Sequence, residues 1–188
     1  GILHPTRGQI RVLGLDPSRQ RKTLARQIGV VFGQRTALWW DLAVQDAFEL
    51  LAGIYGVDAT TYGDRLERFN TVLGTGPLLG IPVRELSLGQ RMRCDLAASL
   101  LHAPPVLFLD EPYTGLDQHA CNFLKKQLQS LHTEKRTILM TTHDISRGLE
   151  MCDKAAILVK GRIAFMKSIE EIDKSNFDRL YFETIING

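Results

Sequence analysis

The chain has 188 residues, of which 44% are hydrophobic and 23% charged, with a net charge of +2. This is enough apolar sequence to bury the core of about one globular domain, and the charge gives no reason to expect a nucleic acid as partner. No apolar run is long enough to span a membrane. Cys94, Cys121 and Cys152 are odd in number and widely spaced, which argues against a disulfide framework and favours a reducing, cytosolic compartment.

The first part of the chain predicts short strands and then helices. Residues 9–13 (QIRVL) and 28–32 (IGVVF) are apolar runs bounded by glycine, proline and polar residues, as strands are. Apolar residues recur at helical spacing from Val44 to Tyr55 and again around Leu66 to Leu73. We therefore expect residues 42–103 to form a mostly helical subdomain.

The second part predicts a parallel sheet. Near-continuous apolar runs occupy 106–109 (VLFL), 137–142 (TILMTT) and 155–159 (AAILV), with helical stretches near 118–131 and 145–152 between them. Strands that are apolar on both faces indicate a covered parallel sheet with helical crossovers. We expect residues 104–174 to be the core α/β part of a single domain, 1–188, into which the helical subdomain is inserted.

Two adjacent carboxylates, Asp110 and Glu111, follow the run at 106–109. At the end of a buried strand such a pair usually has a cation, a hydrogen-bond network or water as its partner. Successive strand side chains point to opposite sides, so one acid could face hydrated magnesium and the other could orient a water molecule. The pair alone leaves open whether it holds a metal ion or is an ordinary solvated strand end.

A helix start at Ser87 offers a second candidate site. Ser87 is a favourable N-cap and Gly89 lets the backbone approach a ligand closely. A hydroxyl and free N–H groups at a helix start can bind an anion. A plain capped helix explains the same residues, so this segment does not decide the function by itself.

Taken together, the motifs resemble the nucleotide-binding domain of ATP-binding cassette (ABC) transporters. VLFLDEP is similar to the Walker B strand, LSLGQ at 86–90 to the signature sequence, and GLD at 115–117 to the D-loop. TTHD with His143 is similar to the switch histidine and VVFGQ with Gln34 to the Q-loop. The resemblance implies a P-loop NTPase-like α/β fold, and the segment from Phe32 to Gly56 is most similar to ABC-2-type exporter subunits.

The resemblance implies ATP and Mg²⁺ as cofactors and assigns a role to each matching residue. Asp110 and Gln34 would hold the metal ion. Glu111, Gln34 and His143 would serve ATP hydrolysis. The residues expected to contact nucleotide bound by an opposite subunit are Ser87, Leu88, Gly89, Gln90 and Asp117. The family usually has glycine where this chain has Leu88, which reduces the freedom of the backbone there.

The implied partners are transmembrane permease subunits and a second copy or a related ATPase subunit, at the cytoplasmic face of the membrane. Two alternatives remain: an ABC ATPase of DNA repair or translation, and an interaction module without nucleotide. The first often carries long coiled-coil inserts or paired cassettes, which this sequence lacks. The second predicts that the motif residues at positions 87, 111 and 143 are replaced by others, yet Ser87, Glu111 and His143 are all present.

The sequence contains no G-x-x-x-x-G-K-[ST] phosphate loop. The nearest string, GRIAFMKS at 161–168, has Met166 where the second glycine belongs, and it predicts a strand followed by a helix start. In the family the loop precedes a turn similar to Pro5, Thr6 and Gly8. We therefore expect the chain to lack an N-terminal segment with the Walker A loop and the first strands.

We expect the 188-residue chain by itself not to bind ATP, because backbone amides and a lysine of the phosphate loop supply most contacts to the phosphates. Titration of the purified chain with ATP, with and without magnesium, measures this. Magnesium-dependent binding with a Kd of about 1 μM would contradict the expectation.

Overall fold

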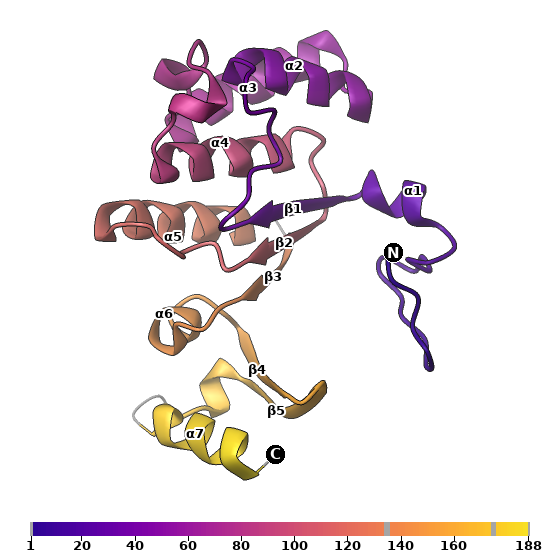
Figure 1. Ribbon diagram of the computed structural model, residues 1–188, viewed down its shortest axis with the longest axis vertical. Coiled ribbons are helices and arrows are strands. Elements are labelled where there is room, and N and C mark those ends of the chain that lie inside the picture. Colours follow the sequence, from indigo (N-terminus) through magenta and orange to yellow (C-terminus); the bar gives the residue numbers. More distant parts are fainter. Residues whose placement is uncertain (1, 134–135, 174–175, 188) are drawn as a thin grey trace. The chain divides into compact units, whose positions relative to one another are not determined.

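The computed structural model describes residues 2–133, 136–173 and 176–187 (Figure 1). Gly1 and Gly188, the ends of the expected domain, and Lys174, the end of the expected core part, lie outside the described residues. The chain divides into two compact units, Gly1–Thr141 and Thr142–Gly188.

The helices are α1 (Arg21–Ala25), α2 (Val44–Tyr55), α3 (Ala59–Leu73), α4 (Leu88–Leu100), α5 (Gln118–Thr133), α6 (Ile145–Leu149) and α7 (Phe177–Asn187). The strands are β1 (Ile28–Phe32), β2 (Val106–Asp110), β3 (Thr137–Thr141), β4 (Lys154–Val159) and β5 (Arg162–Ser168). Short 3₁₀ turns occupy Gly76–Leu78, Val83–Glu85 and Ile169–Glu171. No helix of the described residues has the length and apolar character needed to cross a bilayer.

The first unit contains a parallel sheet with the strand order β1-β2-β3. The predicted strand at 28–32 is confirmed as β1, and the apolar runs at 106–109 and 137–142 are confirmed as β2 and β3. The helices expected from 44 to 55, around 66 to 73 and near 118–131 are confirmed as α2, α3 and α5. Parallel pairing of short strands joined through helices is the arrangement expected of an α/β fold.

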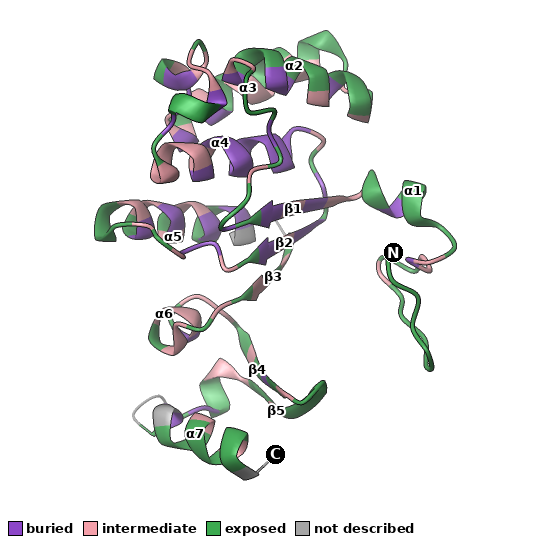
Figure 2. Cartoon of the chain, viewed as in Figure 1, coloured by how far each residue is buried: buried purple, intermediate pink, exposed green. Residues whose placement is uncertain are grey.

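One face of this sheet carries the core of the first unit. Val31, Leu107 and Leu109 are at most 2% exposed, and α4 packs against β1 on one side and against α2 and α3 on the other. Buried residues concentrate in α4, β1 and β2 (Figure 2). The opposite face is more open, because Phe32 and Leu139 are 46% and 53% exposed. The predicted parallel sheet flanked by helices is therefore confirmed, with α4 covering the face that carries the core.

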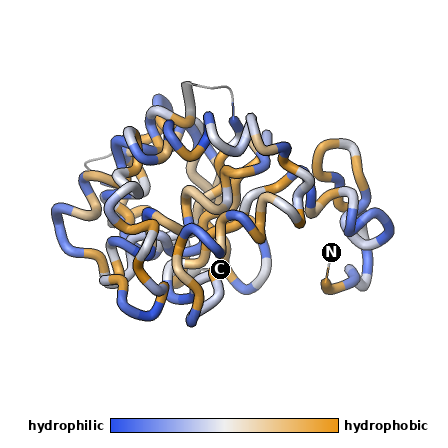
Figure 3. Tube along the Cα trace, turned by 90° about the horizontal axis from the view of Figure 1, so that it is seen from above, coloured by the Kyte–Doolittle hydropathy of each residue, from blue (hydrophilic) through white to orange (hydrophobic). Residues whose placement is uncertain are grey.

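The strand predicted at 9–13 is wrong. Val12 forms only an isolated bridge with Leu15, because Leu13 and Gly14 take left-handed backbone conformations, with φ of 53° and 75°, that turn the chain back at once. Apolar and polar stretches follow one another along the segment near the N-terminus (Figure 3). A strand pattern without a neighbouring strand to pair with does not form a stable strand.

The pairing expected for residues 155–159 is also corrected. The run forms β4, but β4 pairs antiparallel with β5 in the second unit and is not part of the parallel sheet. Lys160 and Gly161, with φ of 47° and 78°, form the tight turn of a hairpin. The prediction of a strand and a helical turn at 161–168 is confirmed by β5 and the 3₁₀ turn Ile169–Glu171. The core of this unit is formed by Leu149, Ile157, Ile172 and Phe177.

A buried carboxylate lies within α4. Asp95 is 5% exposed, and its Oδ1 accepts hydrogen bonds from the Thr36 hydroxyl at 2.7 Å and from the Ala37 backbone N–H at 3.1 Å. Burial raises the pKa of Asp95 from 3.8 to about 6, although these hydrogen bonds and the charge of Arg91 oppose the shift.

We predict that Asp95→Asn removes a pH dependence of stability. Because the pKa of Asp95 is raised by folding, the folded chain keeps this proton to higher pH than the unfolded chain, and the free energy of unfolding falls as the pH rises from 3.8 through about 6. The shift corresponds to roughly 2–3 kcal/mol. Urea unfolding at about pH 4 and about pH 7.5 measures the change. An equal pH dependence in the wild type and the variant would contradict it.

Candidate functional site

The parallel register brings functional side chains to one edge of the sheet. Phe32 of β1 lies beside Asp110 of β2, and Asp110 lies beside Thr141 of β3. All three strands end at this level, so the residues that follow them meet there. Ligand sites of parallel sheets lie beyond the carboxyl ends of the strands, which is where the sequence places Asp110 and Glu111.

Thr141 connects the two acidic residues. Its hydroxyl donates to Asp110 Oδ1 at 2.6 Å and accepts from the Glu111 backbone N–H at 3.1 Å. The sequence analysis did not single out Thr141. The signal that could have found it is its position, since it ends β3 at the same level at which Asp110 ends β2.

Glu111 has a constrained backbone. Its φ is 50°, a left-handed conformation that is costly for a residue other than glycine. It is held by hydrogen bonds from its N–H to the Thr141 carbonyl at 3.2 Å and from the Thr114 N–H to its own carbonyl at 3.1 Å. The Thr114 hydroxyl also donates to Glu111 Oε2 at 3.4 Å. The turn therefore points the half-buried Glu111 away from the line of the strand that carries the exposed Asp110.

Gly33 allows the Gln34 loop to approach the acidic residues. The Gly33 N–H donates to the Asp110 carbonyl at 2.8 Å. A Cβ on Gly33 would collide with the Glu111 carbonyl oxygen, so only glycine fits between β1 and the turn at Glu111. The next residue, Gln34, is exposed and directly follows β1 at the same edge of the sheet.

The signature-like segment forms the start of α4. The Ser87 hydroxyl accepts from the Gln90 backbone N–H at 3.3 Å, and Gln90 Oε1 accepts from the Ser87 N–H at 2.9 Å. This reciprocal capping box fixes the first turn of α4. Ser87 is confirmed as the N-cap, and the side chain of Gln90 shares in the cap.

The D-loop-like segment packs against the signature-like segment. Gly115 has a φ of 75°, and an added Cβ there would lie 2.8 Å from Cδ2 of Leu88. Leu88 therefore occupies the space that the missing side chain of Gly115 leaves. Asp117 Oδ1 accepts from the Ala120 N–H at 2.8 Å and so caps the start of α5.

A hollow of about 160 Å³ lies between α4 and α5. Its lining includes four of the expected nucleotide contacts, Ser87, Gly89, Gln90 and Asp117. A pocket that encloses a ligand of nucleotide size measures about 300 Å³ or more, so this hollow can contact only part of a nucleotide.

The histidine of the predicted site is in the other unit. His143 is exposed in the second unit, directly before Asp144, whose Oδ1 accepts from the Arg147 N–H and caps α6. The structure thus brings Asp110, Glu111 and the Gln34 loop together in the first unit, and it places His143 outside that unit.

The side chains at the strand ends fit magnesium better than zinc. Among the described residues no group of three or more His, Cys, Asp and Glu side chains could hold a metal ion. Magnesium needs only one or two carboxylates, since water and phosphate oxygens fill the rest of its shell. The exposed Asp110 and the amide of Gln34 supply ligands of this kind.

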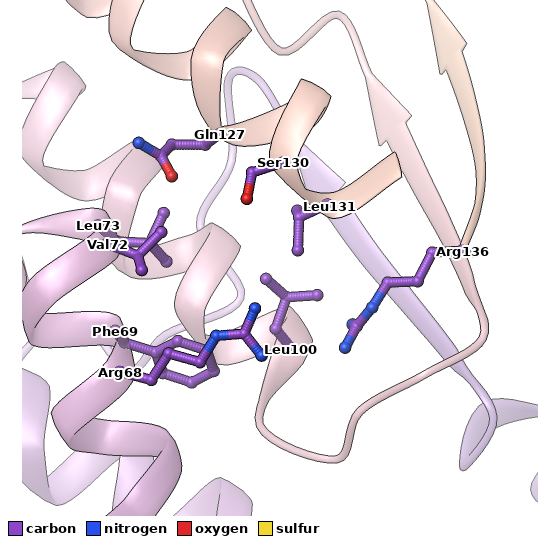
Figure 4. Close-up of a pocket in the computed structure, with 9 residues that line it drawn as sticks. All are labelled: Arg68, Phe69, Val72, Leu73, Leu100, Gln127, Ser130, Leu131 and Arg136. Carbon is purple, nitrogen blue, oxygen red and sulfur yellow. The ribbon is translucent and has the colours of Figure 1, made fainter. Parts of the chain in front are cut away.

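A second cavity, of about 30 Å³, lies among α3, α4 and α5 (Figure 4). The side chains of Phe69, Leu100 and Leu131 line it together with the guanidinium groups of Arg68 and Arg136. It has room for little more than one water molecule, and none of the predicted site residues lines it. We therefore do not consider it a nucleotide site.

The comparison with known proteins decides the family. Residues 1–114 match the family described as ABC transporter. The chain belongs to the ABC transporter family. It is 28% identical over 191 aligned residues to "ABC transporter ATP-binding protein NatA" of Bacillus subtilis, covering 100% of this chain and 78% of the relative. It is 34% identical to "Daunorubicin resistance ATP-binding protein DrrA3" of Streptomyces coeruleorubidus, covering 91% of this chain and 54% of the relative.

The solved structures agree with this assignment. The ABC protein CbiO1 of Clostridium perfringens, described as part of the transporter complex cbiONQ, superposes with a TM-score of 0.80 at 27% identity and covers 100% of this chain and 74% of its own. The predicted ABC ATP-binding domain and its α/β fold are confirmed, and the alternatives outside transport are not favoured. Membership of the ABC family implies ATPase activity for the full-length protein.

We predict that Gly33→Ala destabilises this ABC domain by at least about 2 kcal/mol, because the added methyl group must displace backbone of the Glu111 turn. Gly53→Ala is the matched control. Gly53 lies inside α2 with nothing within 4 Å of an added Cβ, so alanine there should stabilise the helix by about 0.5–1 kcal/mol. Urea unfolding measures both variants, and a neutral Gly33→Ala would show that the close approach is not required.

Proposed function

We propose that the full-length protein is the ATP-hydrolysing subunit of an ABC exporter. The observation that carries the proposal is the meeting of Asp110, Glu111 and Thr141 at the carboxyl edge of the parallel sheet, with Asp110 exposed beside the Gln34 loop. Export is supported by relatives named for Nod factor export and daunorubicin resistance.

Asp110 and Gln34 are the proposed magnesium ligands. The Thr141 hydroxyl bonds to Oδ1 of Asp110, which leaves Oδ2 to face the metal ion or its water. Magnesium, when bound, neutralises phosphate charge during phosphoryl transfer. The carboxylate of Asp110 is exposed and therefore accessible to a metal ion and its water.

Glu111 is the proposed group that orients the attacking water. Its left-handed backbone separates its side chain from that of Asp110, so the acids can serve different roles. The hydrogen bond from the Thr114 hydroxyl to Oε2 restricts the rotamer of Glu111. A carboxylate held in this way can accept a hydrogen bond from water and position it for attack on a phosphate. His143 is proposed to contact the γ-phosphate.

The first turn of α4 is proposed to contact nucleotide held by a second ATP-binding subunit. Free N–H groups and the helix dipole favour a phosphate at this end of the helix. Gly89, next to Leu88 in this turn, lies close to α5, because an added Cβ would be 3.2 Å from the Ala120 Cβ. Ser87 and Gln90 form the cap beside it. Asp117, in the same hollow, is proposed to lie at the interface with that subunit.

The proposed partners are transmembrane permease subunits at the cytoplasmic face of the membrane, together with a second copy or a related ATPase subunit. Trp39 and Trp40, which are 40% and 49% exposed after the Gln34 loop, offer an apolar surface for a permease. CbiO1 is part of a transporter complex, which supports assembly with membrane subunits.

We predict that Glu111→Gln in the full-length protein lowers kcat for ATP hydrolysis by at least about 100-fold and leaves ATP binding nearly unchanged, because the amide cannot accept the proton of the attacking water. Steady-state phosphate release and ATP binding measure the two effects. Glu67→Gln is the control, since Glu67 is an exposed acid of α3. If Glu111→Gln kept a kcat within about twofold of the wild type, the proposed role of Glu111 would be wrong.

A further inference from the structure

The helix that begins at the signature-like segment holds the loop after Gln34 at two places. Asp95 of α4 accepts hydrogen bonds from the Thr36 hydroxyl and the Ala37 N–H. One helical turn earlier, the guanidinium of Arg91 lies 5.3 Å from the centre of the Trp40 ring. Residues four apart lie on the same side of a helix, so one face of α4 contacts the loop through both residues.

The loop that carries Gln34 is short and is fixed at both ends. At one end the Gly33 N–H is bonded to the Asp110 carbonyl at 2.8 Å. At the other end Asp95 holds Thr36 and Ala37. Between these points only Gln34 and Arg35 separate the fixed residues, so Asp95 restricts the backbone from which the Gln34 side chain projects. The Thr36 hydroxyl also accepts from the Leu38 N–H at 3.0 Å and extends the fixed segment to a buried leucine.

An apolar residue at position 95 would avoid the desolvation cost of a buried carboxylate, but it could not accept hydrogen bonds from the loop. Asp95 is 5% exposed, and burying a carboxylate is costly even when it accepts hydrogen bonds. A carboxylate orients the loop, because one of its oxygens accepts hydrogen bonds from both a hydroxyl and a backbone N–H. Stability of the core therefore does not explain Asp95, whereas orientation of the loop does.

We propose that Asp95 is a positioning residue of the ATPase reaction, which sets the Gln34 loop from the helix whose first turn carries Ser87 to Gln90. Asp95 itself contacts no substrate. Because α4 is a continuous helix from Leu88 to Leu100, a displacement of its first turn on nucleotide contact moves Asp95 and, through Thr36 and Ala37, the Gln34 side chain. The proposal rests on the proposed function, since it assigns Asp95 to the same reaction.

The test is a double-mutant cycle in the full-length protein. Asp95→Leu keeps the number and branching of the side-chain heavy atoms and removes both acceptor oxygens, and it is made in the wild type and in a Gln34→Ala background. If Asp95 acts through Gln34, Asp95→Leu lowers kcat about tenfold in the wild type and by less than about twofold in the Gln34→Ala background. Asp95→Asn, which keeps an acceptor oxygen, should restore kcat to within about threefold of the wild type.

Two further variants separate positioning from a general loss of structure. Thr36→Val removes the donor hydroxyl outside the helix and should lower kcat in the same direction as Asp95→Leu. Ser99→Ala is the matched control on α4, because the Ser99 hydroxyl is buried but donates to the Leu96 carbonyl of its own helix at 2.7 Å. Ser99→Ala should leave kcat unchanged, and the thermal midpoint of every variant is measured beside kcat.

The outcomes are distinguishable. Non-additivity with Gln34→Ala, together with recovery in Asp95→Asn, supports the proposal. An equal loss of kcat from Asp95→Leu in both backgrounds, or an equal loss in Ser99→Ala, overturns it while the proposed function stands. A wild-type protein without magnesium-dependent ATP hydrolysis overturns the proposed function itself, and the proposal with it.

Discussion

The parallel hydrogen-bond register of β1, β2 and β3 is the constraint on which the rest of the site depends. It places Phe32, Asp110 and Thr141 at one level, so that the chain leaves all three strands at the same edge. A register shift by a single residue would turn Asp110 toward the buried face, because side chains alternate along a strand. The hydrogen bond from Thr141 to Asp110 and the approach of Gly33 to Glu111 both require this alignment.

The helix α4 links this edge to the rest of the first unit. Most of its length is buried against β1, α2 and α3, so it behaves as a rigid element. Its first turn carries the signature-like residues, Leu88 fills the space beside Gly115, and Asp95 holds the loop after Gln34. Contacts to the D-loop-like segment and to the Q-loop-like segment thus come from one helix. These contacts account for the polar residues Ser87, Gln90 and Asp95 at a helix whose other neighbours are apolar.

The helices and strands that the sequence predicted correctly are those with the strongest periodic pattern of apolar residues. The helices α2 and α3 and the strands β1 to β3 have long or uniform apolar patterns that local packing preserves. The pattern at 9–13 was equally regular, but a strand needs a neighbour, and Val12 finds only Leu15. The run at 155–159 is a strand as predicted, and its antiparallel partner followed from the turn at Lys160 and Gly161, which the sequence analysis did not weigh.

The sequence by itself determined which chemical groups are present: the acids Asp110 and Glu111, the capped helix start at Ser87, and the motifs that resemble the family. It could do so because motif order and residue type do not depend on folding. Only the tertiary structure decided which of these residues meet. Thr141, Gly33 and Asp95 act through contacts with residues far away in the chain, and no local pattern distinguishes such residues from ordinary ones. Register and burial, which are properties of the packed chain, turn these separate motifs into a site.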